Sequence, residues 1–148
     1  RLMEEGHSVE VATKDGAIVY GKYGVPARAT MATTDLKSAN FDCVILPGGF
    51  EAPDRVRLLP EVQVFVREMD EQKKLVAAIC HGPWIMISAK VCKGRKMTAF
   101  WSIEEDIRNS GADYQHKVSV VIDDNFITSP HYNNNGDFMK AVINYLSG

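Results

Sequence analysis

A chain of 148 residues is close to the usual size of one domain, and we expect a single domain over residues 1–148. Hydrophobic residues make up 45% of the chain and charged residues 24%, as in ordinary soluble globular proteins, and a formal net charge of −2 gives no reason to expect nucleic acid or an anionic membrane as a partner. The chain has no apolar run of the roughly 18 residues that span a bilayer and no signal-peptide pattern at its start, so we expect a cytoplasmic protein without a membrane partner.

The first residues, "RLMEEGHSVEVAT", read as the last turn of a helix, a glycine stop at Gly6 and a strand over Ser8–Thr13. A single helical turn is barely stable alone, so we expect a strand and most of a helix to precede Arg1. Further short β-rich runs cover Asp42–Pro47, Lys74–Ile79 and Ser119–Asp123. Three of the four runs are almost wholly apolar, as strands covered on both faces are, which predicts a parallel sheet.

Helical periodicity separates these strands. An amphipathic stretch over Pro60–Gln72 places Val62, Phe65, Val66 and Met69 on one stripe. Three more helices are predicted, a buried one over Gly82–Lys90, an exposed one over Ser102–Gly111 with Ser102 as N-cap, and a closing one over Gly136–Leu146. "VIDDNFITSP" reads as a hairpin, and the alternation of strands and helices indicates a doubly wound α/β sandwich.

Three cysteines, Cys43, Cys80 and Cys92, are an odd number without C-x-x-C spacing, so we expect free thiols, no disulfide framework and no metal or other cofactor. Cys80 lies in "VAAICHGPWIM", where a strand ends and a helix begins. Ala78 and Gly82 supply the small residues that a sharp strand-to-helix turn needs two positions before and after a nucleophile. The following helix N-terminus favours a thiolate, whereas the plainer interpretation makes Cys80 a small buried hydrophobe. The elbow spacing favours the nucleophile.

A second element ends an apolar strand with Pro-Gly-Gly in "VILPGGFEAPD". Without Cβ atoms, Gly48 and Gly49 let backbone N–H groups approach a ligand, and the N–H groups of Gly49 and His81 are candidates for an oxyanion hole over Cys80. A Gly-Gly pair alone could equally turn the chain. Together with the elbow, it indicates a substrate-binding position.

The motifs "VILPGG", "VAAICHGP", "CKGRKMTAF", "EEDIRNSGA" and "DDNFITS" closely resemble the PfpI intracellular protease family of the DJ-one/PfpI superfamily, over essentially the whole chain. The resemblance implies a flavodoxin-like three-layer α/β sandwich of the class I glutamine-amidotransferase type with a nucleophile elbow. It also implies a homodimer or higher homo-oligomer. Activities attached to the family are peptidase, deglycase and glyoxalase-like action and stress protection.

The resemblance further implies a catalytic cysteine followed by histidine, here Cys80 and His81, with an acid from a neighbouring subunit. By position that acid falls on Asp54, whose plainer interpretation is an N-cap of a helix beginning near Arg55. Family members also carry a glutamate after the first strand, which would lie before Arg1.

The chain departs from the family pattern at two more places. Phe100 stands where many relatives have a histidine or tyrosine, so a proton donor is missing from the substrate pocket. "SPHYNNNGDF" replaces Arg-Gly-Pro, so that His131 could offer a different imidazole or could be a solvated loop residue.

Other classes fit less well. A glutamine amidotransferase needs a later His-x-Glu, which the sequence lacks, and a metal enzyme needs a third ligand at a usable spacing. A non-enzymatic redox-sensing or chaperone-like stress protein with a reactive Cys80 stays open. We therefore expect a cysteine-dependent, PfpI-type hydrolase-like enzyme that acts on a peptide or a small carbonyl substrate.

Overall fold

The computed structural model describes residues 1–148, which divide into two compact units, Arg1–Lys37 and Ser38–Gly148. In the first unit, β1 (Ala12–Thr13) pairs in parallel with β4 (Met31–Ala32), and β2 (Val19–Tyr20) pairs antiparallel with β3 (Pro26–Ala27). The strand predicted over Ser8–Thr13 is thus only two residues long, because its partner strand is equally short. Two 3₁₀ turns, η1 (Lys14–Gly16) and η2 (Thr33–Asp35), complete this unit.

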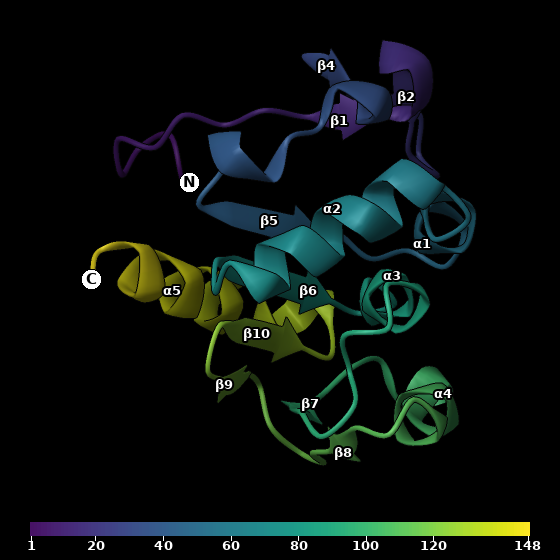
Figure 1. Cartoon of the computed structure of the whole chain (residues 1–148), viewed down its shortest axis with the longest axis vertical. Helices are drawn as coiled ribbons and strands as arrows, with labels where there is room; N and C mark the ends of the chain where they lie inside the picture. The colour runs from purple at the N-terminus through teal and green to yellow at the C-terminus, as the bar shows by residue number, and fades with distance from the viewer. The chain divides into compact units, whose positions relative to one another are not determined.

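The second unit is built on a four-stranded sheet in the order β5-β6-β10-β9 (Figure 1). β5 (Cys43–Leu46), β6 (Leu75–Ile79) and β10 (Phe126–Ser129) run parallel, while β9 (Val121–Asp123) joins β10 as the predicted antiparallel hairpin. Every residue of β6 is buried, as its unbroken apolar run predicts for a central strand. The parallel core of the sheet is confirmed.

Helices cover both faces of this sheet (Figure 1). α2 (Pro60–Glu71) packs on β5 and β6 through the predicted stripe of Val62, Phe65, Val66 and Met69, all of them buried. α5 (Asn135–Leu146) packs on β6 and β10. The result is a three-layer α/β sandwich whose parallel strands deliver their carboxyl ends to one edge. None of its helices combines the length and the apolar character that a membrane span requires.

Shorter elements connect the strands and helices of this unit. α1 (Glu51–Val56) follows β5, and α3 (Pro83–Ser88) follows β6 and contacts α1. Next come β7 (Lys96–Met97), η4 (Trp101–Ile103), α4 (Glu104–Asn109) and β8 (Asp113–Tyr114), with β7 and β8 paired in parallel. The turns η3 (Ser38–Asn40) and η5 (Tyr132–Asn134) precede β5 and α5 respectively.

Two predicted helix caps are wrong. α4 begins at Glu104, and Ser102 lies inside the preceding 3₁₀ turn, so its hydroxyl caps nothing. α1 begins at Glu51, ahead of the start predicted near Arg55, so Asp54 lies inside the helix and not at its N-cap. In both places the chain enters helical geometry before the residue with the best capping side chain, because the local backbone is already turned by 3₁₀ or helical φ/ψ at Phe50 and Trp101.

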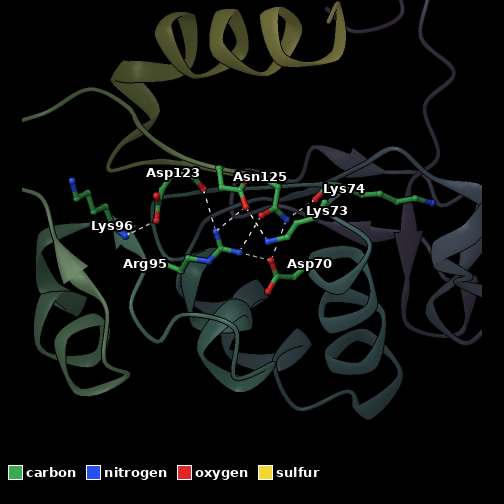
Figure 2. Close-up of polar contacts among 8 residues, drawn as sticks. Asp70, Lys73, Lys74, Arg95, Lys96, Asp123 and Asn125 are labelled. Atoms are coloured by element: carbon green, nitrogen blue, oxygen red, sulfur yellow. Dashed lines mark hydrogen bonds and ion pairs between the residues drawn. The ribbon is translucent and has the colours of Figure 1, made fainter.

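A polar network closes the opposite end of the sheet (Figure 2). Arg95 donates to Asp70 at 2.6 Å and to Asn125 at 3.1 Å, and lies over the Phe126 ring with its guanidinium carbon 4.2 Å from the ring centroid. Asn125 is fully buried and donates in turn to Asp70 and to the Lys74 carbonyl. The network ties the end of α2 and the β9–β10 hairpin to the start of β6.

Candidate active site

Cys80 has a strained backbone. Its φ of +62° lies in the left-handed region, which a side chain with a Cβ rarely adopts. Two hydrogen bonds hold it there: the Cys80 N–H donates to the Ser129 carbonyl, and the Phe100 N–H donates to the Cys80 carbonyl, each at 2.9 Å. Because Cys80 directly follows the buried strand β6, this geometry is that of a nucleophile elbow, as the sequence predicts.

Two glycines make the elbow possible. A Cβ on Gly82 would overlap the Leu46 carbonyl oxygen, so the small residue predicted after the nucleophile is required by the packing of the turn on β5. A Cβ on Gly48 would lie 2.5 Å from the Cys80 Cβ and 3.3 Å from its Sγ. The Gly48–Gly49 segment therefore lies directly against the thiol, and any side chain at Gly48 would displace it.

Two backbone N–H groups of the segments that form the elbow have no acceptor within the chain. Gly49 has a φ of +81°, and neither its N–H nor that of His81 donates a hydrogen bond within the chain. Cys80 itself is half-buried, and unpaired N–H groups are what an oxyanion hole offers to a substrate. The assignment of that role to Gly49 and His81 stays a prediction.

The His81 ring turns back toward the neighbouring cysteine. Its Nδ1 lies 3.3 Å from the Cys80 Sγ, so the two adjacent residues face each other within one chain. Burial lowers the pKa of His81 below its usual value of 6.5. The imidazole is therefore neutral near pH 7 and can accept a proton from the thiol.

The other nitrogen of His81 has a partner that the sequence did not indicate. Ser102 Oγ lies 3.3 Å from Nε2. The ring also stacks on Phe100, with centroids 5.0 Å apart, and meets the Trp84 ring edge to face at 5.0 Å. The sequence pattern predicts a helix cap at Ser102, and the signal that points to the site is its place two residues after Phe100, at the carboxyl edge of the sheet.

An aromatic stack extends from His81 over the site. Phe100 stacks on Trp101 at 3.9 Å, and both rings contact His131, at 5.9 and 5.7 Å between centroids. His131 is half-buried and packs on Tyr132 at 3.9 Å, while its Nδ1 accepts from the Asn133 N–H. The structure thus brings Phe100 and His131 together beside His81, whereas their role in substrate binding stays a prediction.

The remaining sequence candidates lie apart from this contact set. Asp54 is exposed on α1, and no hydrogen bond or ion pair joins it to His81 within the chain. Its contribution to a neighbouring subunit stays a prediction. Burial raises the pKa values of the Cys43 and Cys92 thiols to about 12, so both are unreactive near neutral pH.

Comparison with known proteins gives consistent matches. The chain is 38% identical over 146 residues to Deglycase PfpI of Pyrococcus furiosus, and the matched region covers 99% of this chain and 87% of that protein. YraA of Bacillus subtilis, which carries a provisional cysteine-protease name, is 35% identical over 97% of this chain and 84% of its own length.

The fold has close counterparts among solved structures. A two-domain protein of Anabaena variabilis, containing DJ-1/ThiJ/PfpI-like and ferritin-like domains, matches 99% of this chain with a TM-score of 0.93 and 37% identity. This chain spans 43% of that protein, less than half its length. The fold is therefore flavodoxin-like, of the class I glutamine-amidotransferase type. The DJ-1/PfpI family model matches residues 1–145, and the chain belongs to the DJ-1/PfpI family.

Proposed function

We propose that the chain is a cysteine-dependent hydrolase that acts on carbonyl compounds, with Cys80 as nucleophile. The observation that carries the proposal is the left-handed Cys80 with its Sγ 3.3 Å from Nδ1 of His81, whose pKa burial lowers. Activating a thiol through an adjacent imidazole is a common route to nucleophilic catalysis. The deglycase and protease names of two relatives agree with a hydrolase of this kind.

In the proposed reaction, Sγ adds to an electrophilic carbonyl carbon while the thiol proton passes to His81 Nδ1. The carbonyl electron pair moves to the oxygen, which the N–H groups of Gly49 and His81 would bind. With a peptide, His81 returns the proton to the departing amine, and water then cleaves the thioester. With a dicarbonyl adduct, Sγ adds in the same way to the carbonyl that the adduct retains, and the thiol proton again passes to His81.

The substrate class follows from the groups beside the thiol. Phe100 offers no proton donor to a small substrate, which favours hydrolysis over efficient glyoxalase chemistry. In a homo-oligomer we place Asp54 of the partner subunit in the role of orienting acid, acting on His81 through the Ser102 hydroxyl because Cys80 and Ser102 already contact the two ring nitrogens.

A paired assay tests the proposal. Wild type and Cys80→Ser are compared on a methylglyoxal-modified peptide, on free methylglyoxal and on a fluorogenic peptide. We expect wild-type turnover of one of the two peptides and a loss of about 10³-fold or more in the variant. Equal rates in the two proteins, or a methylglyoxal kcat above roughly 10 s⁻¹ that exceeds turnover of both peptides, would contradict the proposal.

A further inference from the structure

We propose that Ser102 is a positioning residue for His81, completing a Cys80–His81–Ser102 contact chain within a single subunit. The inference rests on the proposed role of Cys80 as nucleophile. Both ring nitrogens of His81 are engaged, Nδ1 by the Cys80 Sγ and Nε2 by the Ser102 Oγ, each at 3.3 Å. Each nitrogen of the ring that can gain or lose a proton therefore has a side-chain partner.

Ser102 is held in place by the same backbone that holds the elbow. The Phe100 N–H donates to the Cys80 carbonyl at 2.9 Å, and the 3₁₀ turn that follows carries Ser102 back over the imidazole. The Ser102 hydroxyl is not used to cap α4, where the cap position is Ile103 and no side chain bonds the helix N-terminus. Its hydroxyl is thus free to serve the ring.

The chemistry of a hydroxyl suits both states of the imidazole. A serine hydroxyl can accept from an Nε2–H and can donate to a bare Nε2. When Nδ1 takes the thiol proton, Nε2–H donates to the Ser102 Oγ, and the hydrogen bond stabilises the imidazolium. A neutral hydroxyl stabilises the imidazolium less than a carboxylate would, so the imidazolium gives up its proton more readily.

Other charged and titratable side chains contact the aromatic neighbours of His81. Asp106 accepts from the Trp84 Nε1 at 2.8 Å, and Arg57 lies over the Trp84 ring at 5.3 Å. His131 stacks on Phe100, the ring that stacks on His81. None of these groups contacts either nitrogen of His81, so substitutions of Ser102 change the hydrogen bond at Nε2 and leave these charges in place.

The test measures the rate of Cys80 alkylation by iodoacetamide between pH 5.5 and 9 in the full chain. The Sγ–carbon bond forms, iodide leaves, and the thiol proton passes through His81 to solvent. Because Cys43 and Cys92 have pKa values of about 12, labelling near neutral pH reports Cys80, and peptide mapping assigns it. NMR of the His81 ring in the same samples gives its titration midpoint.

We expect Ser102→Ala to lower the alkylation rate at pH 7 by about 5-fold, the effect of one lost hydrogen bond. Ser102→Thr keeps the hydroxyl and should restore the rate. Ser102→Asp places a carboxylate at Nε2 and should raise both the rate at pH 6.5 and the His81 midpoint, the latter by about one pH unit or more. Ser110→Ala is the matched control, since its hydroxyl bonds the Ile107 carbonyl at the C-terminal end of α4, away from His81.

An unchanged rate and midpoint in Ser102→Ala would overturn the inference, as would equal losses in the Ala and Asp variants with an unmoved His81 midpoint. The Thr and Asp variants decide the question if the Ala variant does not fold. Failure of the proposed function is a separate result, because alkylation needs no substrate: wild type could turn over neither peptide while its thiol still responds to Ser102.

Discussion

At the scale of single residues, the site depends on two adjacent side chains in an unusual backbone. Cys80 pays a conformational cost in the left-handed region, and the bonds to Ser129 and Phe100 maintain it. In exchange, the turn directs Sγ and the His81 ring toward each other, which neighbouring residues on an extended strand could not do.

The depressed pKa of His81 gives a pH prediction. Because burial disfavours the charged ring, its folded-state pKa lies below 6.5, and the neutral base is present throughout the range above that value. We expect the acid limb of kcat/KM to fall below pH 6.5 and to coincide with the NMR midpoint of His81, assigned with a His81→Gln variant. An acid limb well above pH 6.5 would contradict it. The unfolded chain binds this proton more readily, so the same shift lowers stability as pH falls through about 6.5.

Gly82 gives a prediction of stability. In Gly82→Ala the new Cβ would overlap the Leu46 carbonyl oxygen, a backbone atom that cannot move without disturbing β5. We expect a loss of about 3 kcal/mol or more in the free energy of unfolding, measured with urea. Gly136→Ala is the control: a Cβ there meets nothing within 4 Å and α5 should gain up to about 1 kcal/mol. Equal midpoints for the two variants would show that the elbow tolerates a side chain.

Cys80 and Gly82 could be predicted from the sequence because the elbow requires small residues at a fixed spacing within one short motif. Ser102 could not, because contact with His81 depends on a 3₁₀ turn that follows Phe100 and not on residue type. A serine before a charged helical stretch has the same sequence pattern whether it caps the helix or faces a neighbouring loop.

At the scale of elements, apolar runs and helical stripes predict the sheet and its main helices. Burial on both faces of β6 requires an unbroken apolar run, and burial on one face of α2 requires apolar residues at helical spacing. The end of the sheet opposite the site has no such local sequence pattern. There Arg95, Asp70 and Asn125 come from three separate segments and meet only in the folded chain (Figure 2).

Asn125 is the member of this network that we expect to contribute most to stability. It is fully buried, accepts from Arg95 and donates to Asp70 and to the Lys74 carbonyl, so Asn125→Ala leaves buried polar groups without partners. We expect a loss of about 2–4 kcal/mol by urea unfolding. Lys73→Ala, which breaks only the exposed pair with Asp124, should cost less than about 1 kcal/mol. Comparable losses would mean that the network contributes no more than a surface ion pair.

At the scale of the whole molecule, the proposal is that one subunit completes the site of another. Asp54 is exposed on α1 and touches nothing of His81 in its own chain. If Asp54 of the partner subunit orients His81, Asp54→Ala should lower kcat by about 10²-fold with stability nearly unchanged. The exposed neighbour Arg55, paired with Glu51, supplies the control variant Arg55→Ala.

Mixing subunits separates this role from a local one. Hybrids of inactive Cys80→Ser and inactive Asp54→Ala chains would contain one intact composite site, so we expect part of the activity to return. Hybrids of Cys80→Ser with a chain that carries both substitutions should stay inactive. Full activity in a monomer at micromolar concentration, or no recovery on mixing, would exclude a shared site.

The central claim is that Cys80 performs the reaction, and the most direct measurement plots residual activity against the extent of Cys80 alkylation. Iodoacetamide is added in steps near neutral pH, and the label on the tryptic peptide 75–90 is quantified by mass spectrometry beside the rate on the better peptide substrate. The account predicts a straight line, with activity reaching zero as labelling of Cys80 reaches completion. Activity that survives complete alkylation of Cys80 would contradict it.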